Sequence, residues 1–438
     1  MTVLTYALGV LLFVFGVAVS IGLHELGHLV PGKLFDVKVT QYFVGFGRTV
    51  WSRRRGETEY GLKAVPLGGY VKLVGMLPPA PDADPRSARG ANTGIFAQLM
   101  SDARSAEYEL VEEGDEDRLF YKLPWWKRVI IMASGVLTNL VIAFLLFAVV
   151  FMGHGVATPT TTVGGVSKCV IAVTKANKDK PQRACTAQDQ ESPAKAAGLL
   201  PGDRIVSFNG ARIDDWEEMQ KKIRGNSDGA AVIGVVRGDQ HVTLRTNTTV
   251  SSRADPNDPA TVSSVGFLGV VPTSSIERQN LGFVVSAMST STWATLKALG
   301  NLPVKVYHVG RAGLGLEQRD QNGPMSVVGA GRVAGEMTSQ QSVPASDRFF
   351  SVLILLAGLN LFLGLFNLVP LPPLDGGPIA ATLYEAARRG VAKVLRRPDP
   401  GFVDSAKLLP VTYVMVALIL VVSVVLIYAD IVAPVKMQ

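Results

Sequence analysis

The amino-acid sequence predicts a polytopic α-helical membrane protein with four transmembrane helices, an extracytoplasmic α/β domain and a cytoplasmic β-hairpin region. Three observations indicate this fold class. The composition, with 48% hydrophobic and 18% charged residues and a mean hydropathy of +0.27, is more apolar than that of an ordinary soluble protein. Four uncharged stretches are long enough to cross a bilayer. A polar region of about 200 residues separates the second stretch from the third, so a large aqueous portion is expected.

The four uncharged stretches are residues 3–23, 129–152, 349–374 and 408–429. The first has no Lys or Arg at its start, and no small-residue cleavage site follows it, so we expect it to stay attached as a membrane helix. The chain then divides into a first transmembrane helix (1–30), a cytoplasmic loop with β-hairpins and an acidic insertion (31–128), a second transmembrane helix (129–152), an extracytoplasmic domain (160–275), a membrane-associated amphipathic segment and linker (276–348), a third transmembrane helix (349–377), a basic cytoplasmic loop (378–407) and a fourth transmembrane helix (408–429).

Basic residues beside the stretches predict the orientation. They flank the first loop and crowd the short third one, and loops rich in Lys and Arg stay in the cytoplasm. The residues concerned are Lys33, Lys38, Lys122, Lys127, Arg128, Arg388, Arg389, Lys393, Arg396, Arg397 and Lys407. The N-terminus, region 153–348 and the C-terminus are therefore expected outside. The net charge of +7 is explained by the bilayer as partner, and the sequence shows no nucleic-acid-binding module.

The end of the first stretch carries the motif HELGH at residues 24–28. On a helix, His24 and His28 lie one turn apart on one face and can bind one metal ion, while Glu25 is placed to activate a water molecule. The alternative is that both histidines hydrogen-bond to neighbouring helices. Ionisable residues at membrane depth are costly, so three within five positions favour a metal site of the zinc-hydrolase type.

A catalytic zinc usually has three protein ligands, so a third is needed. The extended pattern HExxHxxGxxH is absent, because Pro31 and Leu34 stand where it needs Gly and His. The other three histidines fall in or beside the predicted external region, on the wrong side of the membrane. They are His154, His241 and His308.

Asp375 is the best-placed third ligand. A helix that enters at residue 349 reaches Asp375 near the cytoplasmic face, at the depth of His24. Asp375 lies in NLVPLPPLDGG at 367–377, where prolines break the helix and glycines permit tight turns. Irregular backbone at this depth is tolerated only when it is buried in protein or lines a watery cavity, and hydrolysis needs such a cavity. The alternative for Asp375 is a turn residue at a helix end.

The two motifs together resemble the site-2 proteases, specifically the bacterial intramembrane zinc metalloproteases that carry a PDZ domain and regulate sigma factors. The resemblance covers nearly the whole chain and includes GFG at 45–47, YGL at 60–62, PLGGYVK at 66–72, SGVLTN at 134–139 and GPMS at 323–326. It implies a Zn²⁺ ion bound by His24, His28 and Asp375, with Glu25 as general base and Asn367 as a contact to the substrate backbone. For Asn367, a hydrogen bond between helices is the alternative.

In the first loop, residues 45–74 alternate apolar and polar around Gly56 and around Gly68-Gly69, which predicts hairpins. An exposed strand edge there can capture a substrate as an added strand, although a plain covering hairpin is the alternative. Residues 82–117 are small, polar and acidic and are predicted to be a solvated insertion.

Outside, residues 192–205 are similar to the PDZ pattern, with strand-like 232–236 and helix-like 215–223. Cys169 and Cys185 both fall in this region, and a disulfide and two free thiols are both open. For residues 281–310 we expect an interfacial amphipathic helix, with a fifth crossing as the alternative.

The function expected from the motifs and the resemblance is a zinc endopeptidase in the bacterial inner membrane that cuts single-span proteins such as anti-sigma factors. The alternative is a PDZ-bearing membrane scaffold or chaperone whose metal site is structural or inactive. The sequence does not fix an oligomeric state.

Overall fold

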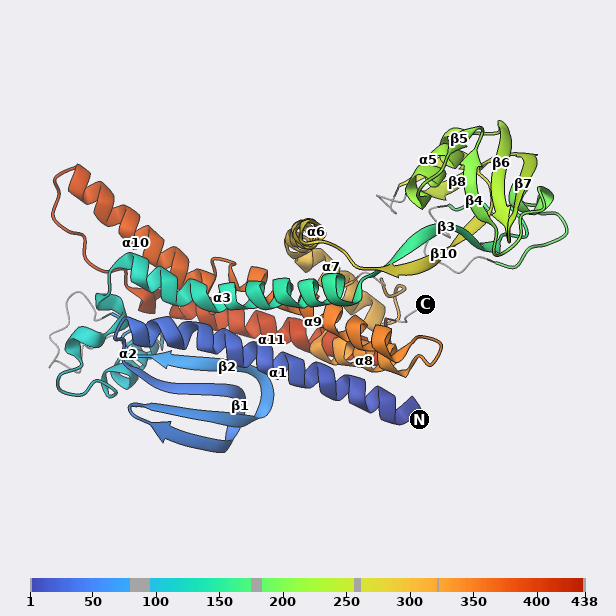
Figure 1. Cartoon of the computed structure of the whole chain (residues 1–438). Helices are drawn as coiled ribbons and strands as arrows, with labels where there is room; N and C mark the ends of the chain where they lie inside the picture. Colours follow the sequence, from blue (N-terminus) through green and yellow to red (C-terminus); the bar gives the residue numbers. More distant parts are fainter. Residues whose placement is uncertain (1, 79–94, 175–182, 256–260, 321–322, 436–438) are drawn as a thin grey trace. The chain divides into compact units, whose positions relative to one another are not determined.

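The computed structural model describes residues 2–78, 95–174, 183–255, 261–320 and 323–435. The chain forms two compact units, one made of residues 1–153 and 280–438 and the other of residues 154–279. The first unit holds the long helices and a β-sheet, and the second is an α/β unit built on an antiparallel sheet (Figure 1).

Among the described residues, four helices are long and apolar enough to cross a membrane, and they contain the four stretches singled out in the sequence, apart from the end of the third. They are α1 (Thr2–Leu34), α3 (Trp125–Ala148) with its π-helical continuation η3 (Val149–His154), α9 (Ala345–Asn367) and α11 (Leu409–Val432). Helix α1 continues past Pro31 to Leu34, four residues beyond the predicted end. The chain is thus a membrane protein with an additional β domain.

Strands β1 (Val39–Arg55) and β2 (Thr58–Leu73) form the predicted hairpin, with its turn at Gly56. Residues 41–44 pair with both 59–62 and 69–72, because both strands bend at glycines with positive φ, Gly45 and Gly68. The second predicted turn, at Gly68-Gly69, is therefore a bend inside β2. In this sheet, residues 41–44 lie between the two segments that they pair with. Residues 69–72 form an edge of the sheet, paired on one side only.

The acidic part of the first loop is more ordered than its composition suggests. Residues 82–94 of the predicted insertion lie outside the described part of the chain, but α2 (Ile95–Tyr108) is a helix, followed by η1 (Glu116–Arg118) and η2 (Phe120–Lys122). Most acidic side chains of these residues are exposed, as predicted for a solvated insertion, but two of them bind the end of the sheet. Glu107 accepts hydrogen bonds from the N–H groups of Met76 and Leu77 (2.5 and 3.0 Å). Asp115 pairs with buried Lys38.

The basic loop expected at residues 378–407 is mostly helical. Helix α10 (Gly376–Val394) is followed by the short η4 (Ser405–Leu408). Buried Glu385 on α10 binds buried Arg128 on α3, with the closest N–O distance 2.5 Å. This ion pair fixes α10 against α3, which explains why a segment so rich in Arg and Lys is ordered.

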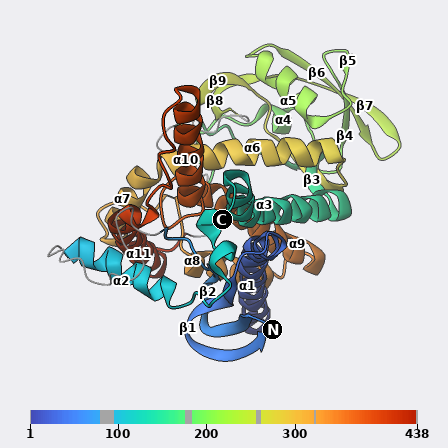
Figure 2. The same cartoon turned by 90° about the vertical axis from the view of Figure 1, so that its left-hand side faces the viewer.

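Between the end of the second unit and α9, the chain forms three further helices of the first unit: α6 (Leu281–Gly300), α7 (Leu302–Gly313) and α8 (Val327–Ser339). In Figure 1, α6 is seen nearly end-on while α1 is seen along its length, so α6 runs across α1; Figure 2 shows α6 from the side. Among the described residues α6 is not one of the helices long and apolar enough to cross a membrane, and the interfacial helix expected for residues 281–310 stays a prediction.

The second unit has the sheet order β10-β3-β4-β6-β7, with β5 beside β4 and a separate β8–β9 hairpin. Helix α5 and the short α4 complete it, and the predicted helix-like and strand-like runs lie at α5 and β6. The bounds are β3 (Val156–Val166), α4 (Pro193–Ala196), β4 (Arg204–Phe208), β5 (Ala211–Arg212), α5 (Trp216–Gly225), β6 (Ala230–Arg237), β7 (Gln240–Asn247), β8 (Thr249–Ala254), β9 (Val262–Phe267) and β10 (Val270–Glu277). Its core is a cluster of buried aliphatic and aromatic side chains from the sheet and α5.

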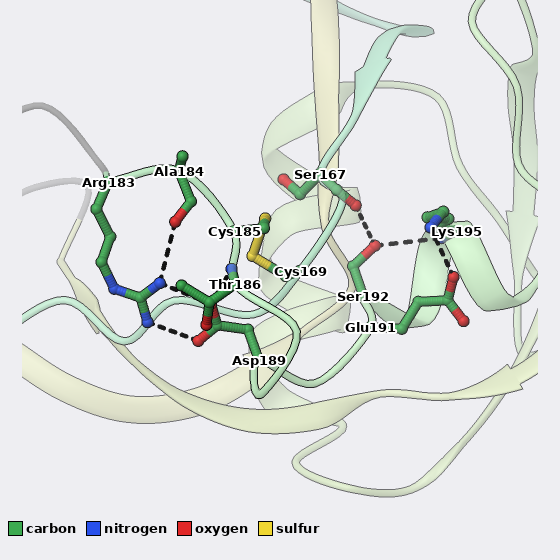
Figure 3. Close-up of a disulfide and its surroundings, with 10 residues drawn as sticks. All are labelled: Ser167, Cys169, Arg183, Ala184, Cys185, Thr186, Asp189, Glu191, Ser192 and Lys195. Carbon is green, nitrogen blue, oxygen red and sulfur yellow. Dashed lines mark hydrogen bonds and ion pairs between the residues drawn. A yellow bond between two sulfur atoms is a disulfide. The ribbon is translucent and has the colours of Figure 1, made fainter.

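The two cysteines form a disulfide, which settles the choice that the sequence left open. Figure 3 shows the Cys169–Cys185 bond next to Ser192, the residue that caps α4. On the other side of the bond, Arg183 makes a two-pronged ion pair with Asp189 (2.6 Å for both contacts). The disulfide therefore closes a loop within the connection between β3 and α4, and Cys169 also pairs by a β-bridge with Glu191 just before α4.

Candidate metal centre

Three of the predicted side chains converge at one point of the first unit. The Nε2 atoms of His24 and His28, one turn apart on α1, lie 3.3 Å from each other. The carboxylate oxygen Oδ2 of Asp375 lies 3.3 Å from the first and 3.4 Å from the second. The three side chains are 11%, 7% and 19% exposed. Two imidazoles from one helix and a carboxylate from a distant segment thus form a nearly equilateral triangle of ligand atoms.

The size of this triangle fits a zinc ion. Tetrahedral zinc with bonds of about 2.0–2.1 Å holds its ligand atoms about 3.3–3.4 Å apart. The three measured separations equal this value, and Oδ2 of Asp375 is buried and makes no hydrogen bond within the described part of the chain. Two imidazoles and a carboxylate also form a donor set that zinc accepts while keeping a fourth position open.

Helix α3 contacts the Nδ1 atoms of both imidazoles, opposite the Nε2 atoms that face Asp375. Nδ1 of His28 lies 2.8 Å from the carbonyl oxygen of Ile131. A carbonyl can only accept, so this nitrogen carries the proton and Nε2 of the neutral ring keeps a free lone pair for a metal. A Cβ atom on Gly135 would lie 2.2 Å from Nε2 of His28, so only glycine leaves room for the ring. Buried Asn139, one turn further along, lies 3.2 Å from Nδ1 of His24.

The third transmembrane helix does not run to Asp375 as predicted, because α9 ends at Asn367. Pro370, Pro372 and Pro373 lack the N–H groups that would continue the helix. The chain makes turns over 368–375, and Asp375 stands directly before α10. A Cβ on Gly376 would lie 2.3 Å from the carbonyl oxygen of Val369, so the tight return needs glycine there. The Asp375 carboxylate is therefore presented by a turn, at the start of a helix anchored on α3.

The triangle borders a cavity of about 530 Å³. Its lining includes the other two predicted residues, Glu25 and Asn367, together with the β2 edge at 68–71. The Glu25 side chain lies close to Gly69, where a Cβ would be 2.9 Å from its Cγ. A potential proton acceptor, an amide and an open strand edge therefore surround the three ligand atoms.

In the sequence, the α3 segment SGVLTN at 134–139 resembles a family segment but has no role assigned to it. The four-residue spacing of Gly135 and Asn139 matches that of His24 and His28, so these two residues can meet one imidazole each on an adjacent helix. That spacing was the available signal, but the helix pairing it needs is a tertiary feature. Of the excluded histidines, His308 contacts Glu317 at 2.8 Å, away from this site.

Known proteins match the chain along most of its length. Residues 12–396 match the family described as peptidase family M50. The chain is 33% identical over 445 residues to the zinc metalloprotease Rip1 of Mycobacterium tuberculosis, which covers 99% of each protein. It is 32% identical over 444 residues to Rip1 of Mycolicibacterium smegmatis, covering 98% of each. It is 28% identical over 392 residues to the metalloprotease MmpA of Caulobacter vibrioides, covering 86% of each.

Proposed function

Since this chain belongs to peptidase family M50 and is a zinc metalloprotease, we propose that it hydrolyses peptide bonds of single-span membrane proteins inside the bilayer. The zinc in this proposal is held by His24, His28 and Asp375. The observation that carries the proposal is the triangle of ligand atoms, which matches tetrahedral zinc in all three separations. The triangle joins the end of α1 to the turn that follows α9.

Glu25 is the proposed general base. A zinc ion held by these residues would polarise the scissile carbonyl and would lower the pKa of a bound water, so that a hydroxide nucleophile could form near neutral pH. Glu25 lines the same cavity and follows His24 directly, so its carboxylate accepts the proton of the attacking water and then passes it to the leaving amine. Asn367 lines the cavity from the end of α9 and holds the substrate backbone or the developing negative charge on the carbonyl oxygen.

A helical peptide bond is poorly exposed to attack, so the enzyme must hold its substrate in an extended form. The β2 edge at 69–71 supports strand addition, because these residues pair with β1 on one side only and line the cavity. A substrate segment added to this edge lies beside Glu25. The alternative of a plain covering hairpin does not explain why the edge faces the cavity.

The proposed physiological substrates are anti-sigma factors that another protease has already cut outside, and this rests on the resemblance to proteases that regulate sigma factors. The proposed orientation puts the N-terminus and the unit 154–279 outside the inner membrane, following the basic residues of the two loops. We assign that unit as a PDZ-like domain, in which a groove binds a peptide end or excludes bulky external domains.

A scaffold or chaperone with an inactive metal site has less support. The matched family consists of peptidases, and the relatives named above are metalloproteases. A scaffold also has no need for a proton acceptor next to the metal ligands, where Glu25 lies.

The test uses the purified full-length protein and a single-span model substrate. Glu25→Ala should abolish cleavage while zinc content and thermal unfolding stay at the parent values, because Glu25 is not among the three ligands. His24→Ala, as the comparison variant, should lose both zinc and cleavage. Equal cleavage by Glu25→Ala and the parent would rule out the proposed peptidase mechanism.

A further inference from the structure

Asn139 on α3 lies behind the metal centre and has no role in the mechanism described so far. Its side chain is buried, and its amide nitrogen as placed lies 3.2 Å from Nδ1 of His24. The amide oxygen is buried too and makes no hydrogen bond to any described residue. The amide therefore contacts the imidazole nitrogen that faces away from Asp375.

The chemistry of a metal-binding imidazole decides which amide atom belongs at this contact. When Nε2 of a neutral imidazole binds a metal, the ring proton is on Nδ1, and Nδ1 then needs an acceptor. The oxygen and nitrogen of an Asn amide exchange places by a half turn of the terminal bond, without moving other atoms. The exchange leaves one amide atom without a partner, as before, so it adds no unpaired group. With zinc bound, Oδ1 of Asn139 faces Nδ1 of His24.

We infer that Asn139 is a positioning residue that fixes the ring orientation and the proton position of His24 for zinc binding. The inference rests on the proposed role of His24 as a ligand. It gives α3 matching roles toward both histidines, since the carbonyl of Ile131 accepts from Nδ1 of His28 in the same way. One helix thus presets both imidazoles, with a main-chain acceptor for one ring and a side-chain acceptor for the other.

The chain offers a matched control in a second buried asparagine. Asn360 on α9 is fully buried, and its amide donates to Ser20 on α1 (3.0 Å) and to the carbonyl of Leu356 (2.8 Å). Its Oδ1, like that of Asn139, makes no hydrogen bond to a described residue. Asn360 therefore joins the same helix α1 one turn before His24 but contacts no metal ligand.

The experiment measures zinc affinity of the full-length protein by competition with a chromophoric chelator, and thermal unfolding of the metal-free form. Asn139→Leu should weaken zinc binding by about 10- to 100-fold, the usual effect of losing such a hydrogen bond. Asn139→Asp supplies a carboxylate acceptor for the same proton and should bind zinc at least as tightly as the parent. Asn360→Leu should leave zinc affinity unchanged while lowering thermal stability.

Two results would overturn the inference: parent-like zinc affinity in Asn139→Leu, or a loss in Asn139→Asp as large as that in Asn139→Leu. An equal loss in Asn360→Leu would also overturn it, because a general loosening of the helices would then explain both. The readout does not depend on cleavage. A parent protein that binds zinc but cuts nothing would contradict the proposed function alone, and one that binds no zinc would contradict both.

Discussion

Gly135 on α3 packs directly against the His28 ring on α1, so Gly135→Ala tests how tightly this ring is held. The added Cβ would lie 2.2 Å from Nε2 and 2.5 Å from Cε1 of His28. Ordinary contact needs about 3.4 Å or more, so Nε2 would have to retreat by roughly 1.2 Å. The ring cannot slide freely, because Nδ1 is held by the carbonyl of Ile131 at 2.8 Å.

A ligand displaced by about 1 Å no longer completes the triangle, so we expect Gly135→Ala to weaken zinc binding at least as much as the loss of a supporting hydrogen bond, about 10- to 100-fold. Overpacking should also cost about 1–3 kcal/mol of stability. Gly358→Ala on α9 is the matched control, since a Cβ there meets no atom within 4 Å. Chelator competition and activity on a single-span substrate provide the readouts. Parent-like zinc affinity and cleavage in Gly135→Ala would refute the assignment of His28 as a tightly held ligand.

Three further predictions concern the metal and the unit 154–279. A chelator should abolish cleavage and added zinc should restore it; activity that survives complete removal of the metal would contradict the proposed chemistry. Hydrogen bonds from Arg237 (2.7 Å) hold the pKa of the Asp203 carboxyl group below its ordinary value. The stabilisation is therefore complete above the unfolded pKa of about 3.9 and is lost as the pH falls through the folded pKa. Thermal unfolding of this unit should show that loss below about pH 4. Asp203→Asn should make the unfolding temperature depend less steeply on pH in this range, and an unchanged pH dependence would argue against the ion pair. Replacing Cys169 and Cys185 by Ser should lower the unfolding free energy of the unit by about 3 kcal/mol, as for a crosslink 16 residues apart, and a denaturant titration that shows no change would contradict this value.

The sequence was sufficient for the features that depend on local pattern. Uncharged stretches of 20 or more residues have few alternatives to membrane helices, so α1, α3, α9 and α11 could be located. The spacing of His24 and His28 sets their common face, and the depth argument selected Asp375, which lies within 3.4 Å of both. That argument selected a residue close to both imidazoles although α9 ends at Asn367, and its role as a metal ligand stays a prediction.

Features that depend on contacts between distant segments could not be predicted from local sequence patterns. Helix α10 looked like a basic loop because its order depends on the buried pair of Glu385 with Arg128, 257 residues apart. Likewise, the sequence did not indicate that Glu107 on α2 binds N–H groups of the chain just after β2. The role of Asn139 follows from the pairing of α1 with α3, which no local pattern specifies.

The central claim is that two imidazoles and one carboxylate share a single zinc ion. X-ray absorption spectroscopy of the zinc-loaded parent protein and of Asp375→Ala measures this directly. The account predicts one zinc with two histidine nitrogens and a carboxylate oxygen at about 2.0–2.1 Å in the parent, and loss of the oxygen ligand with weakened zinc binding in Asp375→Ala. An identical spectrum and affinity in the two proteins would contradict it.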